Sequence, residues 1–136
     1  MTARAQFEDV LGRAAWGYDE NNMDLLAAQF TKHAVMTMRI GRDGEVIGPF
    51  TGRAQIRKLH TDALAAQTDQ RRHNLSNIWV REESADSAIV LSNLTLLSVR
   101  GAALEVLSSG WYRDEFVRDG ACWLIQDRYL YLDLPY

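Results

Sequence analysis

Hydrophobic residues recur at two different spacings along the chain, and the first of these spacings predicts helices. Over residues 4–19 the apolar positions fall three or four residues apart and share one helical face: Phe7, Val10, Leu11, Ala14 and Tyr18. Asn22 is a suitable N-cap for a short second helix that reaches Phe30. A third helix is expected over residues 51–68, and its apolar stripe includes His60.

The second spacing is the alternation of apolar and polar residues that is typical of strands. It begins over residues 33–40, and Asp43 and Gly44 then predict a hairpin turn, because Asp-Gly readily takes positive φ angles. From residue 71 onward the pattern predicts long strands at 71–82, 86–99, 103–117 and 121–134. A parallel return needs a crossover of about a dozen residues, so the short breaks here predict antiparallel pairing.

The order of these elements predicts the fold class. Helices, a hairpin, a further helix and then a four-stranded meander indicate an α+β fold, with about three N-terminal helices packed on one face of a curved mixed or antiparallel sheet. The chain has 136 residues, without internal repeats or a linker-like segment. We therefore expect a single domain over residues 1–136.

Composition narrows the classes of function. Charged residues make up 24% of the chain and the net charge is −3, so the basic surplus of a nucleic-acid-binding protein is absent. No apolar run approaches the roughly 20 residues of a membrane span, and the first residues lack an apolar signal core. The single cysteine, Cys122, excludes an internal disulfide and fits a reducing cytoplasm. No metal-ligand spacing or nucleotide-binding motif is present, so we expect neither metal nor cofactor.

Two titratable residues are the leading candidates for chemistry. Asp19 ends the aromatic run at the end of the first predicted helix, and His73 opens the first long strand. A carboxylate can fix the tautomer of an imidazole and stabilise the imidazolium that forms when the ring takes a proton. Such a pair can abstract an acidic proton and return it to a leaving group. The structural alternatives are a solvent-exposed helix-end carboxylate and a core histidine.

Several stretches together resemble a known family. They are Tyr18-Asp19 followed by residues 23–26 and Phe30; residues 48–56; Arg72-His73 with Asn77; and residues 123–125 leading to Arg128 and Asp133. Their order and spacing resemble the SnoaL-like branch of the nuclear-transport-factor-2-like, or cystatin-like, superfamily. The resemblance implies a cone in which a curved sheet wraps helices around a deep, mostly apolar pocket. Members include scytalone dehydratase, a bile-acid dehydratase, a dehydrochlorinase, and the non-catalytic small subunits of ring-hydroxylating dioxygenases.

The resemblance also implies roles for particular residues. Asp19 and His73 match the positions that the dehydratases and the dehydrochlorinase use for catalysis. Arg128 matches an arginine that faces the leaving group, with a surface or interface pair beside Asp127 as its structural alternative. Ala14 stands where those enzymes carry a further polar residue. A tyrosine of the last strand, Tyr129 or Tyr131, is therefore the candidate for the missing hydroxyl.

Other residues are candidates for binding a substrate. An aromatic wall would suit a flat, apolar, ring-containing ligand. Asn93 lies in the middle of an apolar strand and either hydrogen-bonds a ligand in the pocket or faces solvent. The candidate substrate-binding residues are Trp16, Tyr18, Asn93, Tyr129 and Tyr131.

Three hypotheses for function follow. The first is a cofactor-independent lyase or isomerase that acts on a small hydrophobic cyclic or aromatic molecule through Asp19 and His73, with Arg128 as electrophilic helper. The second is a non-catalytic partner that resembles the small subunit of a ring-hydroxylating dioxygenase. The third is a protein that binds a hydrophobic small molecule without converting it. All three expect a homo-oligomer, either a trimer or a dimer, joined through the last strands.

Overall fold

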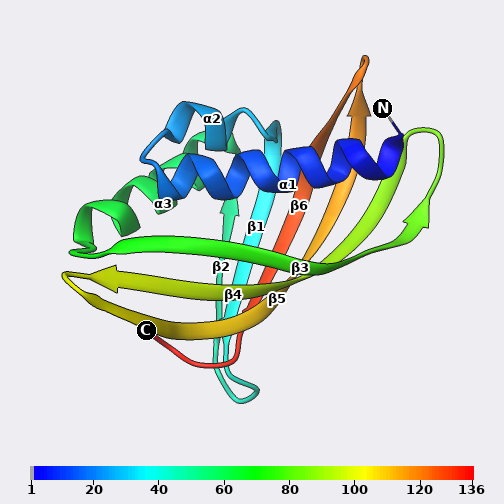
Figure 1. Cartoon of the computed structure of the whole chain (residues 1–136). Coiled ribbons are helices and arrows are strands. Elements are labelled where there is room, and N and C mark those ends of the chain that lie inside the picture. Colours follow the sequence, from blue (N-terminus) through cyan, green and yellow to red (C-terminus); the bar gives the residue numbers. More distant parts are fainter. Residues whose placement is uncertain (1) are drawn as a thin grey trace.

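The fold consists of helices on one side of a curved six-stranded sheet (Figure 1). A computed structural model describes residues 2–136. The helices are α1 (Ala3–Asp19), α2 (Met23–Ala27) and α3 (Arg53–Ala66). The strands are β1 (Phe30–Ile40), β2 (Val46–Thr51), β3 (Gln70–Glu83), β4 (Ser87–Arg100), β5 (Ala103–Asp119) and β6 (Cys122–Leu132). The predicted α+β class with helices on one sheet face is confirmed.

The strand order in the sheet is β2-β1-β6-β5-β4-β3. Every neighbouring pair is antiparallel except β1 and β6, which run parallel, so the sheet is mixed. The long strands β3, β4 and β5 bend, and α1 runs alongside β3 and crosses in front of β1, β5 and β6 (Figure 1). The last strand of the C-terminal meander, β6, thus joins it to the N-terminal hairpin. The C-terminal end of α1 lies beside the start of β3.

Phe30 marks the largest difference from the predicted elements. The second helix ends at Ala27, and Phe30 begins β1 three residues before the predicted strand start. Phe30 pairs with Ile125 of β6, whose backbone N–H donates to the Gln29 carbonyl at 2.9 Å. The pairing partner lies about a hundred residues away in sequence, so local periodicity did not indicate it.

The core lies between α1 and the concave face of the sheet. The predicted apolar face of α1 is buried, including Phe7 and Leu11, which confirms that prediction. The Phe7 ring lies 4.9 Å from the Phe116 ring and 5.0 Å from the Trp123 ring, in tilted and edge-on contacts that favour aromatic packing. Within residues 2–136 no helix combines the length and the apolar character of a membrane span.

Gly17 lets α2 pack closely against α1. A Cβ atom built on Gly17 would lie 2.7 Å from the Leu26 backbone nitrogen, closer than van der Waals contact allows. The absence of a side chain therefore permits the tight turn that follows α1. This close packing fixes the end of α1, from which Tyr18 and Asp19 project.

Candidate active site

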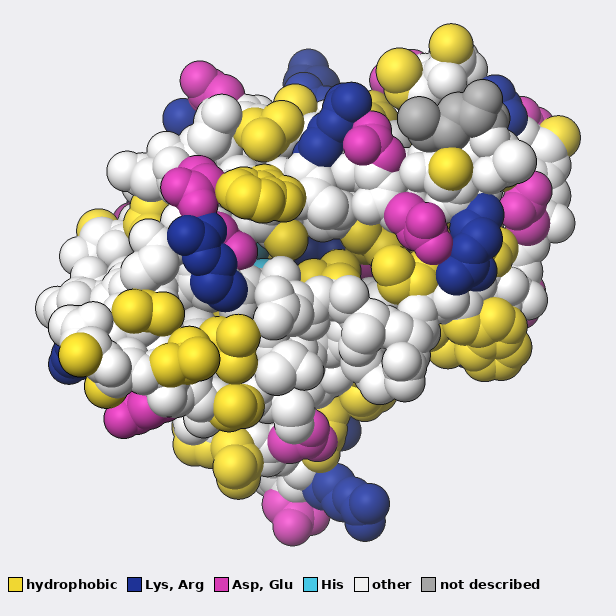
Figure 2. Space-filling view, viewed as in Figure 1, with side chains coloured by type: hydrophobic (Ala, Val, Ile, Leu, Met, Phe, Trp, Pro, Cys, Tyr) yellow, Lys and Arg dark blue, Asp and Glu magenta, His cyan; other side chains and the backbone are white. Residues whose placement is uncertain are grey.

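A small cavity lies between α1, α3 and the concave face of the sheet. Its volume is about 20 Å³, which is enough for one water molecule. Half of its lining residues are apolar, and the other half carry polar groups: Tyr18, His60, His73, Tyr112 and Arg128. Figure 2 shows a narrow hollow with basic and histidine side-chain atoms at its bottom, at the place where α1 faces β3 in Figure 1. Polar groups from five different elements therefore meet in an otherwise apolar space.

Asp19 and His73 lie in direct contact, as the resemblance implied. The His73 ring donates from Nδ1 to Asp19 Oδ1 at 2.6 Å, and the His73 backbone N–H donates to Asp19 Oδ2 at 2.9 Å. The His73 side chain is 15% exposed and the Asp19 side chain is 8% exposed. Both carboxylate oxygens of Asp19 thus accept hydrogen bonds from His73. The other ring nitrogen of His73, Nε2, takes no part in these contacts and is left for a ligand.

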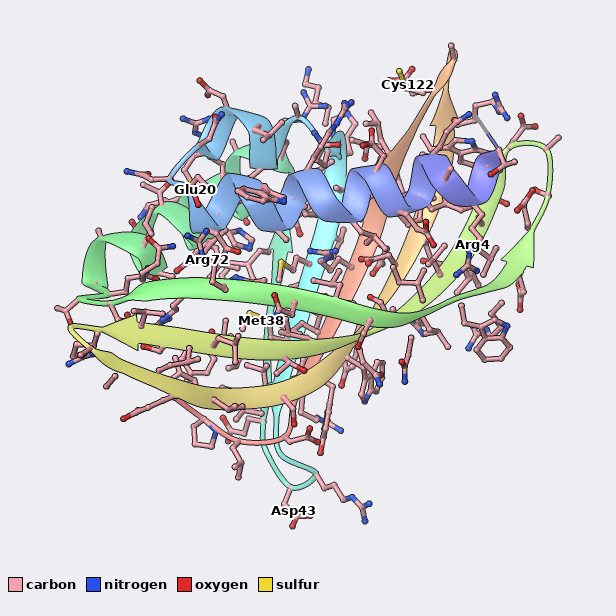
Figure 3. The ribbon with its side chains drawn as sticks, viewed as in Figure 1. Arg4, Glu20, Met38, Asp43, Arg72 and Cys122 are labelled. Carbon is pink, nitrogen blue, oxygen red and sulfur yellow. The ribbon has the colours of Figure 1, made fainter. Side chains whose placement is uncertain are left out.

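Contacts around this pair fasten the end of α1 to the start of β3. The Gln70 side-chain amide donates to the Asp19 carbonyl at 2.8 Å. Glu20 and Arg72 flank the pair in sequence and form an ion pair; Figure 3 shows the two side chains close together at the end of α1. At the opposite end of α1, Arg4 donates to the Ile78 carbonyl of β3 at 2.9 Å. α1 is therefore attached to β3 near both of its ends, and these contacts hold Asp19 and His73 in place.

Arg128 reaches the cavity, but Asp114 already binds it. The guanidinium donates from Nε and Nη2 to the two Asp114 carboxylate oxygens at 2.7 and 3.1 Å, and both side chains are buried. Its central carbon also lies 4.0 Å from the centre of the Tyr112 ring. Burial raises the pKa of Asp114, and the guanidinium opposes that rise. Arg128 is thus part of a buried ion pair across β5 and β6, and not a pair with Asp127.

Two tyrosines supply hydroxyl groups at the cavity, and neither belongs to the last strand. Tyr18 is buried, its ring lies edge-on at 5.0 Å from the His73 ring, and its hydroxyl donates to Gln67 Oε1 at 2.8 Å. Burial raises the pKa of Tyr18 and raises that of Tyr112 to about 12, so both phenols stay protonated near neutral pH. Tyr112 was not predicted; its inward position in the alternating pattern of β5 was the available signal.

His60 is a further cavity residue that the sequence analysis left without a role. It lies on α3, its ring is 5.9 Å from the Tyr18 ring, and its Nδ1 is 2.8 Å from the Ile56 carbonyl oxygen. Burial lowers the pKa of His60 to about 4. Its position on the apolar stripe of the predicted third helix was the signal that could have placed it inside.

Four predicted substrate-binding residues lie outside this cavity, which corrects the expectation for them. Trp16 lies on the outer side of α1 and is 63% exposed. Asn93 is exposed on the outer face of β4, opposite Trp111 in the sheet. The Trp111 ring lies 5.4 Å from the Tyr129 ring and 5.6 Å from the Tyr131 ring on the same outer face. Since residues of a strand alternate between its faces, Tyr129 and Tyr131 point away from Arg128.

The donor atoms of the cavity do not form a metal site. Among residues 2–136 no three His, Cys, Asp or Glu side chains come close enough to hold a metal ion. The cavity instead combines one carboxylate–imidazole pair with phenol, imidazole and guanidinium groups. Such a set can move a proton and can hydrogen-bond a polar group of a ligand.

Sequence and structure comparisons place the chain among known proteins. Residues 1–129 match the SnoaL-like domain family. A search of curated proteins finds no match. A Nostoc punctiforme protein of unknown function with a cystatin-like fold has 20% identity and a TM-score of 0.81, over 99% of this chain and 97% of its own.

Two other solved structures carry more informative descriptions. One is described as the beta subunit of an aromatic-ring-hydroxylating dioxygenase of Novosphingobium aromaticivorans, with 13% identity, a TM-score of 0.82, and coverage of 98% and 91% of the two chains. The other is ActVI-ORFA of Streptomyces coelicolor, with 22% identity, a TM-score of 0.80, and coverage of 97% and 98%. At these identities the likeness establishes the cystatin-like fold, as predicted.

Proposed function

The chain belongs to the SnoaL-like domain family, and on that premise we propose that it is a cofactor-independent lyase or isomerase. The family includes cofactor-free cyclases, isomerases and dehydratases as well as dioxygenase subunits, so the fold leaves the activity open. The observation that carries the proposal is the 2.6 Å contact between Asp19 and the His73 ring beside a shared cavity. An elimination or a proton shift on a small hydrophobic cyclic or aromatic substrate is the reaction that this pair supports best.

In the proposed step, His73 Nε2 takes an acidic proton from a carbon atom of the substrate. Asp19 holds the Nδ1–H and stabilises the imidazolium that results. The same proton then returns, either to a leaving hydroxyl group in an elimination or to another carbon atom in an isomerisation. The Tyr112 hydroxyl supplies the hydrogen-bond donor that Ala14 does not, and both residues line the cavity.

Arg128 has a more limited role in this proposal than the sequence suggested. Asp114 occupies two of its nitrogen atoms and balances its charge. Its remaining amino group, Nη1, is the part that can stabilise negative charge on a substrate. Because the cavity holds about one water molecule, a ring-sized substrate requires the hollow between α1 and β3 to widen.

Solvent exchange tests the proposed proton transfer with simple ketones in place of the natural substrate. The protein is incubated in D₂O with cyclic ketones such as cyclohex-2-enone and 2-tetralone, and loss of the acidic C–H signal is followed by NMR. We expect exchange above the buffer rate, lowered about a hundredfold or more by His73→Ala and by Asp19→Asn. His33→Ala, at an exposed position, is the matched control and keeps the rate. If both cavity variants retain full exchange, the proposed step is wrong.

A second candidate function rests on the outer face of the sheet. Trp79 and Trp111 are 56% and 38% exposed there. A partner chain can cover these rings, as in a homo-oligomer, a trimer or a dimer, or on a larger oxygenase subunit. Absence of exchange on every ketone, together with co-purification of such a subunit, would favour a non-catalytic partner.

The exposed thiol of Cys122 fits a cytoplasmic location.

A further inference from the structure

His60 is a polar group of the cavity that the proposed proton transfer leaves without a task. We propose that His60 accepts a hydrogen bond from a hydroxyl group of the ligand, so that the cavity selects ring compounds that carry a hydroxyl. This inference deepens the proposed function and rests on it, because it assumes that the cavity is the ligand site. It assigns a substrate class, and it makes His60 a residue that positions and selects the substrate.

The contacts of the His60 ring determine which nitrogen can accept. Nδ1 lies 2.8 Å from the Ile56 carbonyl oxygen, which has no proton to donate. Nδ1 must therefore carry the hydrogen, and in a neutral imidazole the lone pair then resides on Nε2. No hydrogen bond to Nε2 occurs within residues 2–136, and His60 lines the cavity. In the proposal, this lone pair accepts the hydrogen bond from a donor that enters the cavity.

The surroundings of His60 keep its ring neutral. Burial lowers its pKa to about 4, and the Ile56 carbonyl only partly opposes this effect. Arg128 from β6 and His73 from β3 also disfavour a positive charge on the ring, while the Tyr18 ring of α1 packs edge-on against it. A neutral ring with Nδ1 already bonded can act at Nε2 only as an acceptor near neutral pH.

This assignment divides the work between the two imidazoles. The Tyr18 ring contacts both of them, with centroid distances of 5.9 Å to His60 and 5.0 Å to His73. His73 has the Asp19 carboxylate that stabilises its protonated form, whereas His60 has no carboxylate partner among residues 2–136. A ligand hydroxyl held at His60 would therefore be fixed relative to the group that exchanges the proton.

Buried acceptors discriminate against ligands that leave them unpaired. A site that hydrogen-bonds a hydroxyl disfavours the analogue without it by about tenfold to a hundredfold, because the acceptor loses its water without gaining a partner. A purely apolar cavity would show no such preference. The ratio between matched ligands therefore reports on His60 separately from the overall affinity.

Binding of phenol and toluene to the full chain tests the inference. The two compounds differ by the hydroxyl group, and titrations followed by protein NMR give both dissociation constants. We expect phenol to bind at least tenfold more tightly than toluene, and His60→Phe to bring the two within about twofold. His33→Phe, on an exposed part of β1, is the matched control and keeps the preference. Retention of the preference in His60→Phe, or failure of the protein to bind phenol, would overturn the inference.

A second measurement covers the case in which His60→Phe does not fold. Long-range ¹H–¹⁵N spectra of the wild-type protein report the tautomer of each histidine. We expect His60 to carry its proton on Nδ1 and its Nε2 resonance to shift when phenol binds. A proton on Nε2, or an unchanged Nε2 resonance at saturating phenol, contradicts the assignment.

The same titration separates this inference from the proposed function. His73→Ala and Asp19→Asn should abolish solvent exchange, and His60→Phe should abolish the preference for phenol. If exchange depends on His73 but His60→Phe keeps the preference, only the role of His60 is wrong. If the preference depends on His60 but no exchange occurs, the cavity binds hydroxylated rings without the proposed chemistry.

Discussion

Neighbouring residues of β6 illustrate the difference between the two faces of the sheet. Arg128 and Leu130 point toward the helices and are buried, whereas Tyr129 and Tyr131 pack beside Trp111 on the outer face. On the inner face polar groups are tied into pairs, such as Asp19 with His73. On the outer face aromatic rings stay accessible. The inner face therefore holds polar groups in fixed pairs, whereas the outer face presents exposed aromatic rings.

The largest expected difference between the faces concerns the buried ion pair. Asp114→Asn removes the charge that balances buried Arg128, and we expect it to lower the free energy of unfolding by about 3–5 kcal/mol. Glu115→Gln, the adjacent residue on the opposite face, is the control and should change it by less than about 0.5 kcal/mol. Urea unfolding measures both. Equal losses in the two variants would contradict the assigned difference between the faces.

A substitution on the outer face should affect association instead of folding. Trp111 is stacked with Tyr131 and 38% exposed, so in an oligomer its ring would be a central contact. We expect Trp111→Ala to weaken self-association about thirtyfold, or 2 kcal/mol, as for an interface hot spot. Trp16→Ala, an exposed tryptophan on α1, is the control. Analytical ultracentrifugation checks this prediction, and an unchanged association constant for Trp111→Ala would exclude that face as the interface.

Three tyrosines test the difference between the two faces of the sheet through the rate of solvent exchange. Tyr112→Phe removes a hydroxyl from the cavity, and we expect about a tenfold lower exchange rate, the scale of one hydrogen bond. Tyr129→Phe and Tyr131→Phe should leave the rate within twofold, because both rings lie on the other face. The NMR exchange assay measures all three variants. A loss confined to the outer tyrosines would reverse the assignment.

His60 gives an expected effect that develops gradually with pH. Its pKa is lowered from 6.5 to about 4 in the folded protein, so between these values the unfolded chain binds a proton that the folded chain does not. The free energy of unfolding therefore falls as the pH falls through this window, by at most about 1.4 kcal/mol per pH unit from this group. His60→Gln should flatten the curve and His33→Gln should not. Urea titrations at several pH values test this, and identical slopes in wild type and His60→Gln would refute it.

The sequence located the parts of the site that depend on local pattern and element order. The apolar face of α1 followed from the spacing of its hydrophobic residues, whereas the pairing of Asp19 with His73 was implied by the family resemblance. Alternation along β6 also carried the information that Arg128 and Tyr129 lie on opposite faces, although both were assigned to the pocket. Strand alternation by itself therefore predicts that the two side chains do not share one pocket.

The remaining errors came from contacts that the sequence does not display. The partner of Arg128 is Asp114, which is set by the exact register of β5 against β6. The start of β1 at Phe30 depends on a parallel strand formed at the other end of the chain. His60 had no partner with recognisable spacing because its partner is a backbone carbonyl. These contacts arise from tertiary packing, which overrides local periodicity.

The second hydrogen bond of Asp19 has an evolutionary consequence. Its Oδ2 accepts from the backbone N–H of residue 73, and that bond does not require an imidazole. Any residue except proline at this position preserves the joint between α1 and β3. A chain with another residue at position 73 would still use Asp19 for this bond. The joint between α1 and β3 and the proposed proton transfer can therefore change independently in evolution.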